Sequence, residues 1–253
     1  MSIIVGTSGW QYGHWKGRFY PKGVPQREWL TYFSERFPAV EINNTFYMLP
    51  RAEVFDRWRE RSTEDFTFAV KASRYITHIR RLRDCRDPLD RFWTSARRLE
   101  PKLGPVLFQL PPNLRGDVDL LRSFLGLLPK DMRAAFEFRH PSWETDETHE
   151  ALDRAGCALV LADRPGARVP HVVTSGWSYV RFHQGRRVAP GYPREKLRRW
   201  ADRLAGIEGD ETWVFFNNDP QGAALRDAVT LTDLLAARGA PVRGPTALDR
   251  SGR

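Results

Sequence analysis

Residues 105–138, PVLFQLPPNLRGDVDLLRSFLGLLPKDMRAAFEF, decide the class of fold. The runs Pro105–Gln109 and Ala134–Phe138 are typical of buried strands, and Val118–Leu128 between them has the apolar spacing of an amphipathic helix. Two strands joined through a helix are parallel, because a parallel crossover needs a dozen or more residues. The stretch therefore predicts one strand–helix–strand unit of an α/β protein.

The same alternation of strand and helix patterns extends along the chain in both directions. We predict the other strands at Ile3–Gly6, Ala39–Asn43, Phe66–Lys71, Ala158–Ala162, Ser178–Phe182 and Thr212–Asn217. We predict the other helices at Arg27–Arg36, Ala52–Arg61, Leu89–Leu99, Glu147–Ala155, Arg194–Leu204 and Ala223–Ala237. Only the sixth connection, Asp163–Gly176, has no clear helical pattern.

Eight such units in 253 residues match the size of a TIM (β/α)8-type barrel. We therefore predict a single-domain α/β barrel over residues 1–240, with the sixth helix short or missing, and a loosely ordered C-terminal tail over residues 241–253. The alternative is an open, doubly wound sheet. No GxGxxG follows the first strand, so the sequence does not support the dinucleotide-binding form of that sheet.

The composition is that of an ordinary globular protein, with 41% hydrophobic and 28% charged residues and a mean hydropathy of −0.53. No apolar run approaches the roughly 20 residues of a membrane span, and no secretory leader is visible after Met1. Two cysteines, Cys85 and Cys157, are too few for a disulfide scaffold or a thiolate metal site. We expect a cytoplasmic protein that does not bind membranes.

The chain is strongly basic, with 40 Lys and Arg against 31 Asp and Glu, a formal charge of +9 and a pI near 9.9. This balance favours an anionic small molecule or a nucleic acid as partner. The alternative is that the excess of Arg over Lys reflects codon composition and not a binding surface. The sequence does not predict protein partners.

Polar residues alternate with apolar ones at the C-terminal ends of six predicted strands. Alternate side chains of a strand face opposite sides, so the apolar set faces the helices and the polar set points into the barrel. Active sites of TIM barrels lie at this end, so we predict a polar, positively charged pocket there. The alternative is an internal ion-pair network that only fills the barrel. The inward polar residues are Glu41, Asn43, Lys71, Gln109, Glu137, Arg139, Arg181, His183 and Asn217.

Seven stretches resemble the YecE-like family called domain of unknown function 72. This resemblance implies a TIM barrel and leaves the activity open. Two positions depart from the family pattern, because Asn44 replaces a common Ser and Gln184 separates His183 from Gly185. The matching stretches are GTSGWQYGHWKGRFYP (6–21), VEINNTFYMLP (40–50), FAVKASRYITHIRRL (68–82), LFQLPP (107–112), FEFRHPSW (136–143), YVRFHQG (179–185) and FFNNDPQGAA (215–224).

Four residues are candidates for catalysis: Glu41, Glu137, Lys71 and His183. The two glutamates are acid/base candidates, and a retaining or inverting glycosidase pair is a weaker reading of them. The sequence leaves open whether burial raises or cations lower their pKa. Lys71 is either a Schiff-base lysine or a counterion for a glutamate.

We predict no cofactor and no metal site. A divalent metal held by histidines and carboxylates, including Asp163, is the alternative. The cationic side chains expected at the same mouth argue against it, because each would repel the ion.

The remaining candidates are expected to bind substrate. Arg139 and Arg181 are suited to grip a phosphate or carboxylate. Asn43, Gln109, Asn217 and Asn218 would donate neutral hydrogen bonds. Aromatic and basic groups that we expect at the same mouth are Trp10, Trp143, His78 and the segment Arg74–Arg86.

Our leading hypothesis is an enzyme acting on a phosphate-bearing small molecule or nucleic acid, such as a phosphate-ester or nucleic-acid-directed hydrolase. The second is a non-catalytic nucleic-acid binding protein, which would depend on Arg74–Arg86 and not on Glu41 or Glu137. The third is a carbohydrate isomerase or hydrolase.

Overall fold

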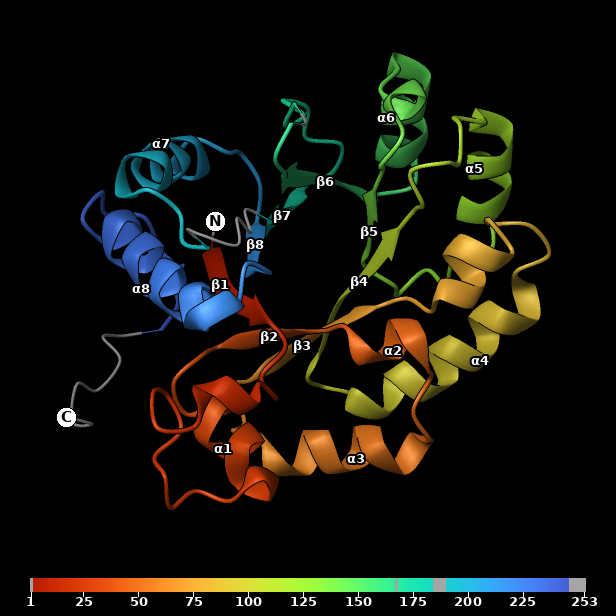
Figure 1. Cartoon of the computed structure of the whole chain (residues 1–253). Coiled ribbons are helices and arrows are strands. Elements are labelled where there is room, and N and C mark those ends of the chain that lie inside the picture. The colour runs from red at the N-terminus through yellow and green to blue at the C-terminus, as the bar shows by residue number, and fades with distance from the viewer. Residues whose placement is uncertain (1, 167, 184–189, 246–253) are drawn as a thin grey trace.

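The eight predicted strands form a closed parallel ring in the computed structural model, which describes residues 2–166, 168–183 and 190–245 (Figure 1). β1 pairs with β8 on one side and β2 on the other, so the ring closes. This closure confirms the TIM-type barrel and excludes the open sheet. The strands are β1 (Ser2–Ser8), β2 (Ala39–Ile42), β3 (Thr67–Lys71), β4 (Leu103–Gln109), β5 (Ala134–Glu137), β6 (Ala158–Asp163), β7 (Trp177–Phe182) and β8 (Glu211–Phe216).

Helices surround the ring of strands, as Figure 1 shows. Every predicted helix is present, with ends shifted by a few residues at most positions. The described residues between β6 and β7 contain no helix, as expected for the sixth connection. None of the helices in the described part of the chain is long and apolar enough to cross a membrane. The helices at predicted positions are α1 (Trp29–Ser34), α3 (Ala52–Arg61), α4 (Arg86–Ala96), α5 (Val118–Leu125), α6 (Asp146–Arg154), α7 (Arg194–Ala205) and α8 (Ala223–Ala236).

Two short helical segments follow β2 and β3, at positions where the sequence pattern predicts no helix. They are α2 (Asn44–Tyr47) and a π-helix, η3 (Tyr75–Ile79). Each spans about one turn, which is too short for an apolar repeat to be recognised. Both lie at the C-terminal end of the barrel, beside the candidate site.

The C-terminal segment adds a ninth strand, β9 (Val242–Arg243), which pairs with the beginning of β1 at Ile3. β1 pairs with β2 only through Thr7 and Ser8, so β9 occupies the free edge of the first half of β1. The predicted loose tail is therefore corrected at these two positions, which belong to the sheet. Residues 246–253 of that tail lie outside the described residues.

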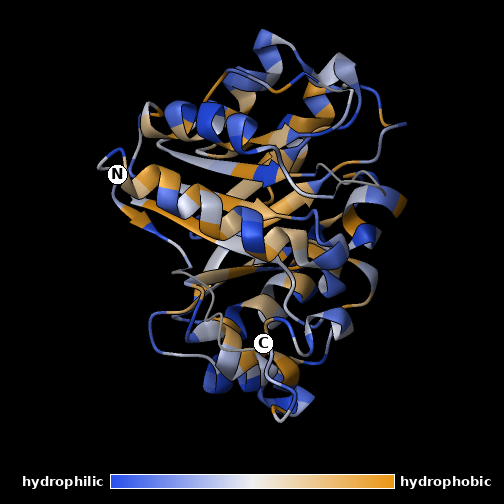
Figure 2. Ribbon diagram, turned by 60° about the vertical axis from the view of Figure 1, so that its left-hand side comes forward, coloured by the Kyte–Doolittle hydropathy of each residue, from blue (hydrophilic) through white to orange (hydrophobic). Residues whose placement is uncertain are grey.

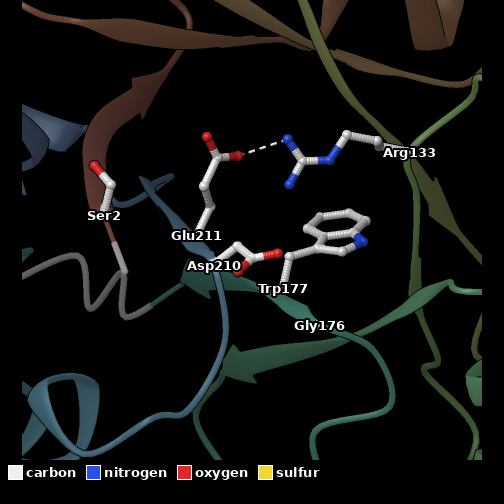
Figure 3. Close-up of a pocket in the computed structure, with 6 residues that line it drawn as sticks. All are labelled: Ser2, Arg133, Gly176, Trp177, Asp210 and Glu211. Carbon is white, nitrogen blue, oxygen red and sulfur yellow. Dashed lines mark hydrogen bonds and ion pairs between the residues drawn. The ribbon is translucent and has the colours of Figure 1, made fainter.

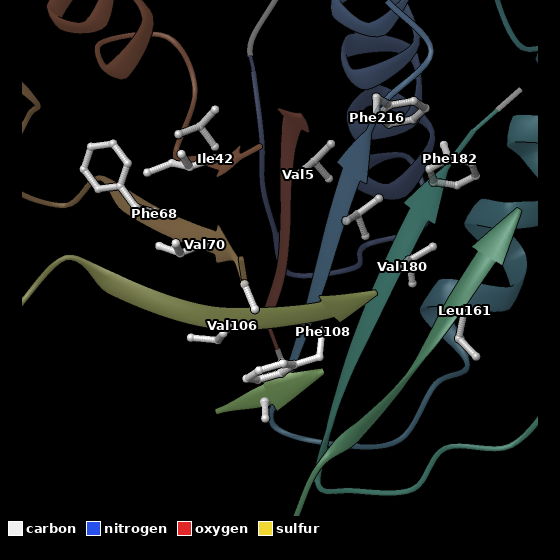
Figure 4. Close-up of a cluster of buried hydrophobic side chains, with 14 of the residues drawn as sticks. Val5, Ile42, Phe68, Val70, Val106, Phe108, Leu161, Val180, Phe182 and Phe216 are labelled. Carbon is white, nitrogen blue, oxygen red and sulfur yellow. The ribbon is translucent and has the colours of Figure 1, made fainter. Parts of the chain in front are cut away.

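Apolar side chains on the outer faces of the strands pack against the helices. They form one large buried cluster, as the alternation of apolar and polar residues predicts. Figure 2 shows hydrophobic residues concentrated along the strands and hydrophilic residues interspersed along the helices. Outward residues labelled in Figure 4 are Val5, Ile42, Phe68, Val70, Val106, Phe108, Leu161, Val180, Phe182 and Phe216.

A second, smaller cluster fills part of the barrel interior. Strands β2, β3, β5 and β6 contribute small alanines to it, whereas β7 and β8 contribute large aromatic rings. The rings fill the space that the alanines leave, which gives the close packing of a protein interior. Members of this interior cluster include Ala39, Ala69, Ala135, Ala158, Tyr179, Trp213 and Phe215.

Candidate functional site

Polar side chains occupy the barrel interior at the C-terminal ends of the strands. Lys71, Gln109 and Glu137 are the last residues of β3, β4 and β5. Their apolar neighbours on each strand face the helices, so the alternation turns the polar groups inward. We call the following set the mouth cluster: Glu41, Lys71, Gln109, Glu137 and Arg181.

Arg181 joins the two glutamates at the centre of the mouth cluster. Its Nη2 donates to Glu41 Oε1 at 2.7 Å, and its Nη1 donates to Glu137 Oε2 at 2.5 Å. Each of the three side chains is at most 1% exposed. Burial alone would lower the pKa of Arg181, but the two carboxylates outweigh it and raise that pKa. The guanidinium therefore stays charged between two buried anions.

Both glutamates are ionised at neutral pH. Burial alone would raise each pKa, but Arg181 outweighs it, so the pKa of Glu41 is lowered and that of Glu137 is lowered well below its usual value. This answers the question that the sequence left open. Neither carboxyl group holds a proton at neutral pH, so neither can serve as a general acid there.

A hydrogen-bonded chain leads from Glu137 to Lys71. Gln109 Nε2 donates to Glu137 Oε2 at 2.9 Å, and Lys71 Nζ donates to Gln109 Oε1 at 3.0 Å. Lys71 Nζ also lies 4.0 Å from the centre of the Phe46 ring, which α2 places beside it. Gln109 therefore fixes the position of the ammonium group relative to the glutamate.

The edge of the cluster contains three more predicted residues. His183 Nε2 lies 3.2 Å from Arg181 Nη1 and 3.5 Å from Glu137 Oε1, and its Nδ1 lies 3.1 Å from Asn217 Nδ2. Asn43 Nδ2 donates to Glu41 Oε1 at 3.2 Å. Burial and then Arg181 lower the pKa of His183, so its imidazole is neutral at pH 7.

Tyr179 contacts the mouth cluster, although it is not among the candidate residues predicted from the sequence. Its hydroxyl donates to Glu41 Oε2 at 2.7 Å from a fully buried position. It lies two residues before Arg181 on β7 and therefore shares its inward face. The alternation that predicts Arg181 thus contains the signal for Tyr179 as well.

Further cations surround the outer edge of the mouth. Arg139 Nε donates to Glu137 Oε1 at 2.7 Å, and its side chain is 26% exposed. Its terminal amino groups make no hydrogen bond to the residues that the structure describes. Arg164, which follows β6, has a buried Nε without a hydrogen-bond partner in the described ranges. Burial, and next the charge of Arg139, lower the pKa of Arg164, so the two guanidinium groups repel each other.

The pKa of His78 is affected by the same concentration of positive charge. Its ring packs against Phe46 at 4.9 Å, and its Nδ1 lies 2.9 Å from Thr77 Oγ1. Burial and then nearby cations, first among them Lys71, lower the pKa of His78 to about 4. His78 is therefore neutral at pH 7 and lies beside the mouth cluster, near where the sequence places it.

Three predicted binding residues lie away from the mouth cluster. Trp10 is 4% exposed, and its ring packs edge-on against Trp58. Trp143 is fully buried, stacks on a neighbouring Phe ring at 4.7 Å and donates from Nε1 to the carbonyl of Leu114. Asn218 is 1% exposed and donates to Asp227 of α8 at 2.6 Å. The expectation that the two tryptophans stack on a ligand is corrected, because core side chains cover their rings.

The segment after β3 presents exposed aromatic and basic groups. Tyr75 and Ile79 of η3 are exposed, and Tyr47 and Met48 at the end of α2 are more exposed still. They lie in or near the basic segment Arg74–Arg86, at the C-terminal side of the barrel. This surface fits the aromatic and basic character that the sequence predicts for the mouth.

The geometry argues against a glycosidase pair. A single guanidinium contacts both Glu41 and Glu137, so it occupies the space in which a sugar and its attacking water would have to lie.

Asp163, a member of the alternative metal set, is bound instead to Lys196 Nζ and Trp200 Nε1, each at 2.7 Å. Within the described residues, no group of three or more His, Cys, Asp or Glu side chains is arranged to hold a metal ion.

A cavity of about 540 Å³ lies at the opposite, N-terminal end of the barrel (Figure 3). Arg133 Nη1 and Glu211 Oε2 pair across it at 2.5 Å, and the Arg133 guanidinium lies 4.7 Å from the centre of the Trp177 ring. The Arg133 guanidinium therefore already has a carboxylate partner, Glu211, and an aromatic partner, Trp177. Arg133 therefore provides a matched control for the mouth arginines.

The chain resembles proteins whose own descriptions state no activity. The family model described as "Protein of unknown function DUF72" matches residues 4–250. UPF0759 protein YecE of Escherichia coli (strain K12) is 33% identical over 177 residues, which cover 67% of this chain and only 62% of that protein. UPF0759 protein YunF of Bacillus subtilis (strain 168) is 27% identical over 92% of this chain and 94% of that protein. A crystal structure of a DUF72 family protein from Thermotoga maritima is similar with a TM-score of 0.84 and 28% identity, over 93% of this chain and 100% of that one.

Proposed function

The chain belongs to the DUF72 family of proteins of unknown function, and we propose that it binds a phosphate-bearing ligand at the C-terminal mouth of its barrel. The observation that carries the proposal is the pair Arg139 and Arg164. These two guanidinium groups repel each other and retain N–H groups that no described residue accepts. A dianionic phosphate placed between them would relieve the repulsion and accept several charge-assisted hydrogen bonds.

The charges of the mouth support an anionic ligand. Glu41 and Glu137 supply two negative charges, whereas Arg181, Arg139 and Lys71 supply three positive charges when the lysine is protonated. Arg181 neutralises part of the carboxylate charge at the centre, which leaves the excess of positive charge toward the rim. Phosphate is attracted to such an excess in a partly buried site, where solvent screens it weakly.

The catalytic roles differ from the leading sequence hypothesis. Glu41 and Glu137 are ionised and held by Arg181, so their role is to position that guanidinium. His183 is neutral at pH 7 and lies at the edge of the cluster, so it is the better acid/base candidate for a bound ligand. A phosphate-ester hydrolase in which His183 accepts a proton is the reaction class that fits these groups.

Thermal unfolding in the presence of ribose 5-phosphate, inorganic phosphate and ribose tests the proposal at constant ionic strength. A ligand at 100 times its dissociation constant stabilises the folded protein by about 2.7 kcal/mol, which raises the midpoint measurably. We expect stabilisation by the two phosphate compounds and none by ribose. Arg139→Gln should abolish the response, whereas Arg133→Gln at the other end of the barrel should retain it. An equal response in the Arg139→Gln variant, or none in the wild type, would contradict the proposal.

A second candidate function is binding of single-stranded nucleic acid, favoured by the exposed side chains near η3. Tyr75, within the basic segment Arg74–Arg86, is 42% exposed, and Tyr47 near that segment is 72% exposed. Exposed rings next to cations allow bases to stack while the backbone phosphates are neutralised. This function uses the rim surface and does not require the mouth cluster.

Fluorescence anisotropy of a short labelled single-stranded DNA tests the second candidate at two salt concentrations. Stacking contributes about 1–3 kcal/mol per base, so Tyr75→Ala should weaken binding by roughly 5- to 150-fold. The control is Val172→Ala, which alters an exposed apolar residue in the connection between β6 and β7. Affinity that is independent of salt, or unchanged in Tyr75→Ala, would exclude this function.

A further inference from the structure

Lys71 differs from the arginines of the mouth cluster in its partners. It is 8% exposed, and its Nζ contacts the neutral amide oxygen of Gln109 at 3.0 Å and the face of the Phe46 ring at 4.0 Å. It makes no ion pair with a carboxylate among the residues that the structure describes. The counterion role that the sequence left open for Lys71 is therefore not the arrangement found.

The carboxylates nearest to Lys71 are held by other groups. Glu137 accepts from Arg181 and Gln109 on Oε2 and from Arg139 on Oε1. Because Gln109 donates its amide nitrogen to Glu137, its oxygen must face Lys71. The lysine is thus held in place by a neutral acceptor, without a negative partner that would stabilise its charged form.

This environment increases the fraction of Lys71 that is present as the neutral amine. Burial, and next the charge of Arg181, lower the pKa of Lys71 to about 8, against the opposing effect of Glu41 and Glu137. At pH 7 about one molecule in ten then has a neutral Nζ, compared with fewer than about one in a thousand for an ordinary lysine. The neutral amine is the form that attacks carbonyl carbon.

We propose that Lys71 forms a Schiff base with the aldehyde or ketone group of a phosphate-bearing substrate. The inference rests on the proposed function in one respect, because Arg139 and Arg164 are to hold the phosphate. Arg139 and Lys71 lie close enough for their charges to interact, so a phosphate at Arg139 brings the rest of a small molecule to the lysine. Lys71 at the end of β3 and Arg139, two residues after β5, would thus serve one ligand.

The bond changes balance without an oxidant or reductant. The neutral Nζ attacks the carbonyl carbon, a C–N bond forms, and the carbonyl oxygen takes up a proton. That oxygen leaves as water after a second protonation, while the amine loses one proton and a C=N bond forms. The product is a protonated imine that withdraws electrons from the adjacent carbon, and water reverses the sequence.

Reductive trapping tests the inference directly. The folded protein is incubated at pH 7 with pyridoxal 5′-phosphate and sodium cyanoborohydride, whose hydride reduces the imine to a stable secondary amine. Peptide mass spectrometry then measures labelling at each of the six lysines: Lys16, Lys22, Lys71, Lys102, Lys130 and Lys196.

We expect Lys71 to be labelled at least about tenfold faster than any other lysine, because its neutral fraction is larger. Its labelling rate should rise with pH and level off above about pH 8. In urea the preference for Lys71 should disappear. Labelling of Lys71 no faster than that of the other lysines in the folded protein would overturn the inference.

Two variants and a second probe separate this inference from the proposed function. Lys71→Arg keeps the positive charge and should remove the fast labelling at position 71, so that only the slow labelling of the other lysines remains. Lys102→Arg, at the N-terminal end of β4, alters a lysine whose Nζ is bound by three oxygens and should leave labelling of Lys71 unchanged. Pyridoxal, which lacks the phosphate, should label Lys71 more slowly than pyridoxal 5′-phosphate does.

Equal labelling of Lys71 by the two probes would support the Schiff base and overturn the phosphate-bearing class of substrate. If ribose 5-phosphate stabilises the protein but pyridoxal 5′-phosphate forms no adduct at Lys71, the proposed function is supported and the Schiff base is overturned. Circular dichroism of Lys71→Arg establishes whether the variant is folded.

Discussion

Arg181 on β7 donates a hydrogen bond of 2.7 Å to Glu41 on β2, 140 positions earlier in the chain, and both side chains are buried. The pair spans the interior of the barrel, because β2 and β7 are not neighbours in the ring. Arg181 also holds Glu137, so one guanidinium connects three strands. The central charge of the mouth is therefore part of the structural framework of the barrel.

Replacement of Arg181 by Met should strongly destabilise the protein. The change leaves two buried carboxylates without their shared cation, and breaking a buried pair in this way costs about 3–5 kcal/mol. Urea unfolding measures the loss. Arg133→Met, which removes a half-exposed ion pair with Glu211, should cost about 1 kcal/mol or less. Equal losses in the two variants would show that the buried network contributes no more than a surface pair.

Glu137 should make the protein less stable in acid. Its pKa is lower in the folded than in the unfolded state, so the unfolded chain binds protons first as the pH falls. The stabilisation is complete above the ordinary pKa of 4.5 and is lost as the pH falls through the folded value. Relative to wild type, Glu137→Gln should be most destabilised near pH 7, and the difference should shrink below pH 4.5. A difference that stays constant between pH 7 and pH 3 contradicts this assignment.

Asp227 on α8 should have the opposite dependence on pH. Burial raises its pKa from 3.8 to about 6, against hydrogen bonds from the Tyr192 backbone and Asn218. The folded state therefore binds the proton more tightly, and stability is lost as the pH rises from about 4 to 6. The free energy of unfolding of Asp227→Asn relative to wild type should rise by up to about 3 kcal/mol across this interval. Urea unfolding at several pH values measures it, and a falling difference would refute the raised pKa.

Trp143 should be needed for stability and not for ligand binding. Trp143→Ala should cost about 3–5 kcal/mol, because the ring is fully buried. Trp143→Phe keeps a ring against Phe138 and should retain the thermal response to ribose 5-phosphate. A folded Trp143→Phe variant that has lost this response would restore the contact role expected from the sequence.

Gly6 on β1 is required where two strands approach closely. A Cβ at this position would lie 2.3 Å from the carbonyl oxygen of Ala39 and 3.1 Å from Phe215 Cε1. Gly6→Ala should therefore destabilise the protein by about 1–3 kcal/mol or more in urea unfolding. The control is Gly13→Ala, whose added methyl group meets nothing within 4 Å and should change stability by about 0.5 kcal/mol or less. Equal effects would contradict the close approach.

Local patterns in the sequence were sufficient to predict the barrel and the inward polar residues. The alternation that places Lys71, Gln109 and Glu137 inside depends only on neighbours along each strand. The sharing of Arg181 by two glutamates depends on distances across the barrel, so the direction of their pKa shifts was not predictable. The burial of Trp143 depends on its stacking against Phe138, and β9 is too short to leave a pattern.

The pairing of β1 affects how the protein is made. Among the strands of the barrel, β1 is made before the others, and it pairs along six positions with β8, which is made more than 200 residues later, and at its beginning with β9. Until Glu211–Phe216 has emerged, the nascent chain carries a strand whose edge has no lasting partner. Such an edge can pair with other chains, so we expect a chain that ends before β8 to be prone to aggregation.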